Sequence, residues 1–359
     1  MRYVFWLSVL FVVILTGCTQ KQEEAPPEEK AAPEGRSVSS LIPRRQGGNL
    51  YLIKVNGKVG YINNKGEIVI EPQFSDGGIF SEGLAPVELD PVDDRWGYID
   101  ETGRFVIEPM YVDAGFFSEG MAAVEIEPFP GAEYAMAGFI DREGNFLIDP
   151  IYEEADYFSE GLAPVKVKDK WGFINKEGIV EIAPIFDLVE HFSEGIARVR
   201  LDGKWGFIFK SGDYMHKPAF KLAWDFHENR APVQDTLSGL WGYLNDIGKM
   251  VIQPKYEAAG IFMNGLAPVL LEGKAGFIDW DDNMIIEPSF EAAKNFSEGR
   301  APVKKNGLWG YIDRLGKEVI KPQFRWAGLF SGGIAPVETL DGELAYIDKD
   351  GNFVFKPSP

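Results

Sequence analysis

The stretch Gly172-Phe-Ile-Asn-Lys-Glu-Gly-Ile-Val-Glu-Ile-Ala-Pro-Ile-Phe-Asp-Leu-Val-Glu-His-Phe-Ser-Glu-Gly-Ile-Ala197 decides the fold of this chain, because its pattern recurs along the sequence. In each copy a glycine is followed 25 residues later by an alanine. The eight pairs are Gly60/Ala85, Gly97/Ala122, Gly138/Ala163, Gly172/Ala197, Gly206/Ala231, Gly242/Ala267, Gly276/Ala301 and Gly310/Ala335. The segment from each alanine to the next glycine varies in length, so the chain is a tandem repeat with one permissive loop.

The residues around each of these glycines predict a strand and a hairpin. An aromatic residue and then Ile or Leu follow the glycine, and Ala345 takes its place in a ninth unit. Such residues favour strands, and a glycine among them indicates a bulge or a close backbone approach. A second glycine comes six residues later in eight of the nine units, which predicts a tight hairpin.

The rest of each unit predicts a second strand, a connector and a third strand. Ile ten residues after the first glycine marks the second strand, and Pro two residues later, in all nine units, is expected to end it. In the connector that follows, apolar residues are spaced by three and Gly usually closes it, which fits a helical turn with a left-handed cap. The Ala-Pro-Val segment then begins the next strand.

The fold class is therefore all-β, built from tandem three-stranded meanders. We favour an open superhelical array, with a β-propeller-like ring as the alternative. Nine blades would exceed the usual range of propellers, which is about four to eight. In addition, the array begins with the strand at Leu50–Val55 and ends with the strand at Asn352–Lys356, so no strand is left to complete a shared blade.

The N-terminus has the order of an export signal. Residues 1–17 carry one basic residue and an apolar run that is short for a membrane span. Leu15-Thr16-Gly17-Cys18 resembles the lipobox of bacterial lipoproteins, which implies cleavage before Cys18 and lipidation of its sulfur. Residues 18–47 are rich in Pro and Glu and predict a disordered tether. Residues 48–359 hold the nine repeats, and Thr19 after the cysteine resembles lipoproteins sent to an outer membrane.

The repeat itself resembles the WG (KWG) repeat of bacterial surface and secreted proteins. Lys170-Trp-Gly-Phe-Ile174 and Lys204-Trp-Gly-Phe-Ile208 are close forms, and the likeness covers about residues 50–357. The resemblance implies little about biochemistry beyond a distant similarity to cell-wall-binding hairpin repeats.

Aromatic side chains are the sharpest functional feature. Two explanations stay open for them: a ladder that binds sugar rings or cations, and packing in the core. The candidate binding surface consists of Trp96, Trp171, Trp205, Trp241, Trp309, Tyr98 and Tyr311.

Other candidate chemistry is weak. His191, His216 and His227 lack metal-ligand spacing, and Asp279-Trp-Asp-Asp-Asn283 imitates a calcium loop but fits a hairpin turn better. The glutamates that recur before the connector's last glycine predict a backbone role rather than catalysis. They are Glu82, Glu119, Glu160, Glu194, Glu228 and Glu298.

The sequence therefore predicts a membrane-anchored binding or scaffold module of the cell envelope, which engages a protein or a cell-wall glycan through an extended repeat surface. The alternative is a structural spacer without a ligand. The formal net charge of −19 argues against nucleic-acid binding. We expect no enzymatic activity, no cofactor and no metal.

Overall fold

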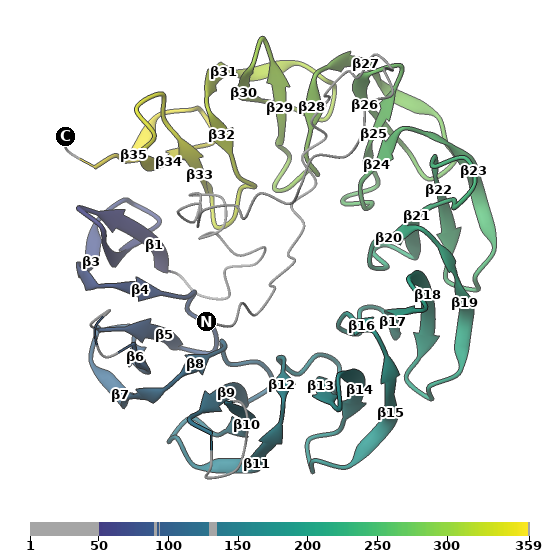
Figure 1. Cartoon of the computed structure of the whole chain (residues 1–359). Coiled ribbons are helices and arrows are strands. Elements are labelled where there is room, and N and C mark those ends of the chain that lie inside the picture. Colours follow the sequence, from purple (N-terminus) through teal and green to yellow (C-terminus); the bar gives the residue numbers. More distant parts are fainter. Residues whose placement is uncertain (1–49, 90–91, 93, 129–134, 358–359) are drawn as a thin grey trace, which may run out of the picture.

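The structure is a computed structural model that describes residues 50–89, 92, 94–128 and 135–357. These residues form 35 strands and no helix. The strands make nine small antiparallel sheets that stand side by side in a ring (Figure 1). The favoured open array is therefore wrong, and the β-propeller-like ring given as the alternative is confirmed. We call the sheets blades 1 to 9 in chain order.

Blade 1 contains β1 (Leu50–Val55), β2 (Lys58–Asn63) and β3 (Ile68–Phe74). Blade 2 contains β4 (Asp76–Gly77), β5 (Leu84–Glu88), β6 (Trp96–Asp100) and β7 (Phe105–Tyr111), and blade 3 contains β8 (Asp113–Ala114), β9 (Ala122–Ile126), β10 (Met136–Ile140) and β11 (Phe146–Tyr152). Blade 4 contains β12 (Glu154–Ala155), β13 (Ala163–Val167), β14 (Lys170–Ile174) and β15 (Val180–Phe186). Blade 5 contains β16 (Leu188–Val189), β17 (Ile196–Leu201), β18 (Lys204–Phe209) and β19 (Tyr214–Phe220).

Blade 6 contains β20 (Leu222–Ala223), β21 (Arg230–Gln234), β22 (Trp241–Asn245) and β23 (Met250–Tyr256), and blade 7 contains β24 (Ala258–Ala259), β25 (Ala267–Leu271), β26 (Lys274–Ile278) and β27 (Met284–Phe290). Blade 8 contains β28 (Ala292–Ala293), β29 (Ala301–Lys305), β30 (Leu308–Ile312) and β31 (Glu318–Phe324). Blade 9 contains β32 (Trp326–Ala327), β33 (Ile334–Glu338), β34 (Leu344–Asp348) and β35 (Phe353–Phe355). In blades 2 to 9 the two-residue strand lies innermost, and in every blade the last strand lies at the rim (Figure 1).

The connector is a hairpin rather than the helical turn that its spacing predicts. In blade 5, β16 pairs with β17, and Ser193 and Ile196 then exchange backbone hydrogen bonds of 3.0 and 3.2 Å. Glu194 and Gly195 between them have φ of 54° and 77°. Two consecutive positive φ values are the mark of a two-residue hairpin turn of type I′. The glycine is left-handed as expected, but it closes a hairpin.

The first glycine of each unit permits the close approach that its position predicts. A Cβ at Gly60 would lie 2.6 Å from the carbonyl oxygen of Ile70. Here β2 and β3 pair with a bulge, so that Val59 faces Phe74 while Tyr61 faces Ile70. The proline of the unit, Pro72, lies inside this bulge and the strand continues past it. The expectation that proline ends the strand is wrong, because a residue inside the bulge does not have to donate a ladder hydrogen bond.

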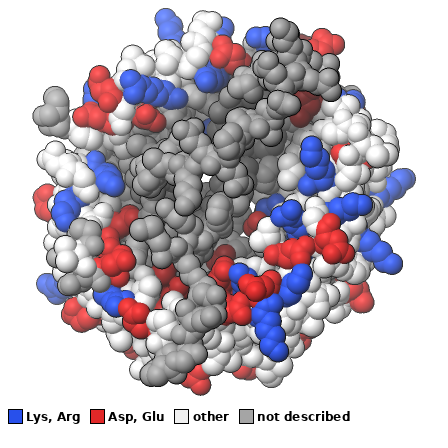
Figure 2. Space-filling model, viewed as in Figure 1, with Lys and Arg blue, Asp and Glu red and all other residues white. Residues whose placement is uncertain are grey.

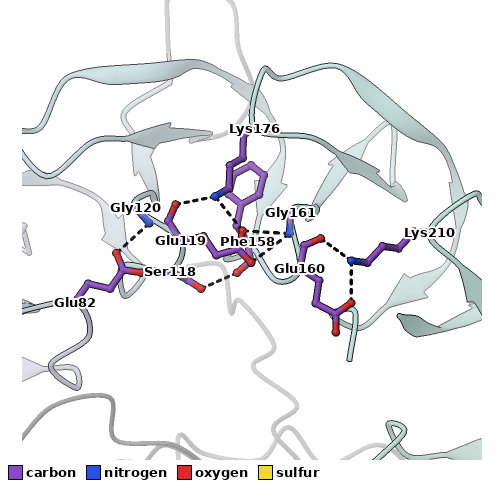
Figure 3. Close-up of polar contacts among 9 residues, drawn as sticks. All are labelled: Glu82, Ser118, Glu119, Gly120, Phe158, Glu160, Gly161, Lys176 and Lys210. Atoms are coloured by element: carbon purple, nitrogen blue, oxygen red, sulfur yellow. Dashed lines mark hydrogen bonds and ion pairs between the residues drawn. The ribbon is translucent and has the colours of Figure 1, made fainter. Parts of the chain in front are cut away.

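Six blades are fastened to the next by polar side chains of their connector hairpins. Ser118 Oγ of blade 3 donates to the carbonyl of Phe158 in blade 4 at 2.7 Å (Figure 3). The carboxylate of Glu119 accepts from the N–H of Gly161 at 3.1 Å and pairs with Nζ of Lys176 at 3.0 Å. Glutamates of five other blades accept from turn N–H groups of the following blade, at Glu82, Glu160, Glu194, Glu228 and Glu298. The recurring glutamates thus have the backbone role that the sequence predicts.

The ring closes between blade 9 and blade 1 without a shared strand. The hydroxyl of Tyr346 donates to the carbonyl of Leu52 at 2.7 Å, and the rings of Tyr346 and Tyr51 meet edge to face at 5.8 Å. Ile53, Ile62, Ile334 and Leu344 bury their side chains around these two rings. The lack of a spare terminal strand therefore does not prevent closure, because side-chain packing replaces strand exchange at the seam.

Candidate functional site

The position directly after the two-residue inner strand distinguishes some blades from others. In four blades this position is glycine, and its carbonyl accepts a hydrogen bond from a tyrosine hydroxyl of the preceding blade. The four pairs are Tyr61 with Gly78, Tyr98 with Gly115, Tyr243 with Gly260 and Tyr311 with Gly328, at 2.7 to 2.8 Å. Each pair is separated by 17 residues in the sequence.

The other four blades with this position carry a large or charged side chain there. They are Asp156, Glu190, Trp224 and Lys294, and in each case the residue 17 positions earlier is Phe instead of Tyr: Phe139, Phe173, Phe207 and Phe277. The tyrosine hydroxyl and the glycine are thus lost together. Asp156, Glu190 and Trp224 belong to consecutive blades, 4 to 6. On this side of the ring, the inner position therefore carries acidic and aromatic side chains instead of glycine.

Arg198 organises the charged groups of this side. It takes the strand position that proline holds in most blades, and its side chain is only 5% exposed. Its Nε donates to Asp225 Oδ1 at 2.6 Å, one terminal nitrogen contacts Glu190 Oε1 at 3.0 Å, and the other donates to the carbonyl of Ala223 at 2.7 Å. A buried guanidinium with two carboxylates in fixed directions is a rigid hub.

Two tryptophans cover the faces of this guanidinium. The Arg198 carbon Cζ lies 4.9 Å from the ring centre of Trp205 and 5.3 Å from that of Trp224. These distances are within the range of cation–π attraction. Trp205 therefore contributes to an internal contact of the ring rather than to an exposed ladder.

A stack of aromatic rings runs beside the hub across blades 3 to 5. Phe116 lies 4.6 Å from Tyr157, and Tyr157 stacks on His191 with ring centres 3.5 Å apart and an interplanar angle of 10°. His191 Nε2 also lies 3.4 Å from Asp156 Oδ2. We call Phe116, Asp156, Tyr157, Glu190, His191, Arg198 and Asp225 the inner cluster.

The charges of the inner cluster shift its pKa values. Burial alone would lower the pKa of His191, but the carboxylates of Asp156, Glu190 and Asp225 outweigh burial and raise it. Burial raises the pKa of Glu190 against the opposing effect of Arg198. The carboxylates of Asp156, Glu190 and Asp225 keep 27%, 31% and 34% of their side-chain surface exposed. The cluster therefore presents partly exposed anionic oxygens beside a flat aromatic stack.

Lys294 in blade 8 is the fourth departure from glycine, and it is buried. Its Nζ donates to the carbonyl of Ala327 at 2.7 Å and lies 4.9 and 4.1 Å from the ring centres of Trp309 and Trp326. Burial lowers the pKa of Lys294 to about 7. Lys294 thus resembles Arg198: each is a cation that lies between two tryptophans and reaches the next blade. Among the described residues, Lys294 has no carboxylate partner.

The predicted binding surface lies largely in the core. Tyr98 and Tyr311 are fully buried, Trp205, Trp241 and Trp309 are buried, and Trp96 and Trp171 are intermediate. The aromatic residues of the repeat contribute mainly to packing between blades, which is the alternative that the sequence left open. Sequence reasoning missed the inner cluster, although the joint change from Tyr and Gly to Phe and a larger residue at a spacing of 17 is readable in the sequence.

The remaining candidates are placed as follows. His191 belongs to the inner cluster, His216 is in β19 and His227 in a connector hairpin. Asp279 starts a hairpin turn, in which its Oδ1 accepts from the N–H groups of Asp281 and Asn283, as the hairpin interpretation predicts. Within the described ranges, no three His, Cys, Asp or Glu residues are grouped so that they could hold a metal ion. Cys18 and residues 18–47 lie outside the described residues.

The surface has no single sign of charge on the face viewed in Figure 2, where acidic and basic side chains are intermingled around the ring. In the part of the chain that the structure describes, no helix is long and apolar enough to cross a bilayer.

Comparison with protein families gives one repeated match. A family model described as "WG containing repeat" matches residues 60–90, 96–127, 138–171, 171–205, 205–235, 241–274, 276–309 and 309–342. No curated protein sequence matches the chain.

Solved structures are similar to this chain at low identity. A crystal structure described as the eukaryotic initiation factor has a TM-score of 0.60 at 13% identity, covering 85% of this chain and 94% of that chain. BamB from Moraxella catarrhalis has a TM-score of 0.42 at 8% identity, covering 85% and 97%, and the dihydro-heme d1 dehydrogenase NirN has 0.44 at 14%, covering 83% and 81%. The similarity with a TM-score of 0.60 concerns the fold alone and carries no information about activity.

Proposed function

The chain belongs to the WG-repeat family, and we propose that it is a lipid-anchored, non-enzymatic binding module of the cell envelope whose ligand site is the inner cluster. Cys18 is the proposed lipidation site and residues 18–47 the tether. The proposed partner is an envelope protein or a cell-wall glycan. The observation that carries the proposal is the departure of blades 4 to 6 from the glycine that plain blades hold at the inner position.

The geometry supports recognition of a ligand that carries a cationic hydrogen-bond donor. Glu190 and Asp225 each commit one oxygen to Arg198 and leave about a third of the side chain exposed. An ammonium group placed between them would gain two charge-assisted hydrogen bonds. The edges of the stacked rings of Tyr157 and His191 beside them suit contact with an apolar stem or the apolar side of a sugar ring. An amino-bearing peptide or glycan combines both features.

The test is retention of purified protein on envelope fractions and on peptidoglycan, followed by calorimetry with the retained component. Glu190→Gln should weaken binding about tenfold or more through the loss of one charged hydrogen bond. Tyr157→Ala should weaken it about as much, because it removes the middle ring of the aromatic stack. Asn295→Ala, at the residue that corresponds to His191 in blade 8, serves as the matched control and should bind normally. Equal binding by all four proteins, or no retention by any, would favour the structural spacer instead.

The anchor has its own test. Mass spectrometry of the mature N-terminus should find Cys18 acylated, and Cys18→Ser should move the protein from the membrane fraction to the soluble fraction. An unmodified Cys18 would overturn the anchor and leave the binding site standing.

A further inference from the structure

Three consecutive blades carry large apolar side chains at the tips of their outer hairpin turns. They are Ile247 in blade 6, Trp280 in blade 7 and Leu315 in blade 8, with 74%, 49% and 90% exposure. In the other six blades the same two turn positions hold only polar or charged residues: Asn64 and Lys65, Glu101 and Thr102, Arg142 and Glu143, Lys176 and Glu177, Lys210 and Ser211, and Lys349 and Asp350. The repeat therefore does not need apolar tips.

One of the three tips, Trp280, replaces a residue that has a structural task in other blades. Lys176, Lys210 and Lys349 pair with Glu119, Glu160 and Glu298 of the preceding blade at 3.0 Å. In blade 7 the residue at this position is Trp280, and Glu228 of blade 6 is left with the turn N–H groups of Asn264 and Gly265. An exposed tryptophan in place of an inter-blade ion pair points to contact with something outside the chain.

The three tips share a face with the start of the ring. Each turn is closed by a backbone hydrogen bond, at Asn245–Gly248, Asp279–Asp282 and Asp313–Gly316, and the corresponding turn of blade 1 is Asn63–Gly66. Leu50, the first described residue, pairs with Asn63. The chain therefore enters the ring on the face that carries the turns, which we call the turn face.

We propose that the turn face of blades 6 to 8 docks on the surface of a lipid bilayer, with Ile247, Trp280 and Leu315 inserted at the boundary between headgroups and acyl chains. The proposal rests on the membrane anchor of the proposed function, because a tether from the bilayer to Leu50 presents this face to it. Trp is enriched at membrane interfaces, and Leu and Ile gain from leaving water. The rigid two-residue turns hold the three side chains in place before contact.

The contact must be apolar rather than electrostatic. The chain has a formal net charge of −19, and the three turns themselves contain Asp246, Asp281 and Asp282 beside Arg314. An anionic bilayer would repel such a surface. We therefore expect zwitterionic vesicles to be bound at least as well as anionic ones, which separates insertion from charge-driven adsorption.

The experiment uses the chain from residue 18 onward with Cys18→Ser, so that no acyl group contributes, and phosphatidylcholine vesicles in a co-sedimentation assay. The triple variant Ile247→Ser, Trp280→Ser, Leu315→Ser should reduce the apparent affinity for vesicles at least tenfold. The matched control is Leu237→Ser with Leu340→Ser, two exposed apolar residues in the hairpins at the opposite ends of the sheets, and it should bind like the parent chain. Thermal melts of all proteins should coincide, since the changed side chains are exposed.

Equal vesicle binding by parent and triple variant, or no binding by the parent, would overturn the proposal. If the parent ignores vesicles but self-associates in sedimentation equilibrium, and the triple variant does not, the tips form an interface between copies instead. Because the assay contains neither an acylated cysteine nor an envelope ligand, its outcome is independent of the tests of the anchor and of the inner cluster.

Discussion

The hydroxyl of Tyr51 occupies the place that a side chain at residue 332 would need. Tyr51 donates to the carbonyl of Ser331 at 3.0 Å, and a Cβ built on Gly332 would overlap the hydroxyl oxygen. Six earlier connector hairpins have glutamate at this position, and its carboxylate reaches the following blade. Blade 9 is followed in the ring by blade 1, which offers Tyr51 instead. Gly332 is thus the adaptation of the repeat to the closing contact.

Restoring the repeat at this point should damage the ring. Gly332→Glu would displace Tyr51 and break its partly buried hydrogen bond. We expect a loss of about 2–4 kcal/mol in the free energy of unfolding, typical of overpacking combined with a lost hydrogen bond. Chemical denaturation measures this. Asn264→Glu introduces glutamate at the same repeat position of blade 7, where φ is also positive. This variant should be close to neutral in stability. Equal losses in both variants would mean that backbone strain, and not the seam, sets the cost.

The inter-blade glutamates should make stability sensitive to acid. Burial would raise the pKa of Glu119, but Lys176 and the N–H groups of Glu160 and Gly161 outweigh burial and lower it. A lowered folded pKa means that the stabilisation is complete above the ordinary value of 4.5 and disappears as the pH falls through the folded pKa. Glu119→Gln should therefore lose stability at pH 7 and show a smaller fall between pH 5 and pH 3 than the parent chain, measured by thermal melts. A parallel pH profile would contradict this account.

Lys294 should make stability depend on pH in the same direction, but at neutral to alkaline pH. Burial lowers its pKa to about 7, while the unfolded chain keeps the proton to about its ordinary value of 10.5. Between these values the unfolded state binds more protons, so this lysine makes stability rise with pH. Lys294→Met should be more stable than the parent at pH 6 by about 1–3 kcal/mol, with a smaller difference at pH 9. Lys321→Met, at an exposed residue of β31, is the control and should leave the free energy of unfolding unchanged at both pH 6 and pH 9.

The hydroxyl of Tyr243 should contribute measurably to the joint between blades 6 and 7. It donates to the buried carbonyl of Gly260 at 2.8 Å. Tyr243→Phe leaves this carbonyl without its partner and should cost about 1–2 kcal/mol in unfolding free energy. Tyr214→Phe, at an exposed tyrosine of β19, is the control and should be neutral within the error of denaturation curves. An unchanged free energy of unfolding in Tyr243→Phe would show that the hydrogen bond between Tyr243 and Gly260 does not stabilise the joint.

Local rules predicted the parts of the repeat that depend on one or two residues. The close approach at Gly60 and the positive φ of 81° at Gly66 follow from the steric freedom of glycine and could be placed from spacing alone. The same reasoning failed at Pro72, because a bulge relieved it of a ladder bond, and at the connector, because Glu194 adopts a positive φ that its residue type does not favour. A carboxylate that accepts hydrogen bonds from the following blade accompanies that backbone geometry.

By itself the sequence determined the repeat, its all-β character and its number of units, since these follow from the periodic placement of glycine, proline and aromatic residues. Only the tertiary structure decided that the units close into a ring and that Asp156, Glu190 and His191 gather with Arg198 and Asp225 on one side of it. The reason is that curvature is set by contacts between blades, such as Ser118 with Phe158, and by the seam between Tyr51 and Ser331, 280 residues apart in the chain. The rotation between neighbouring sheets depends on how these contacts pack, and no local pattern encodes it.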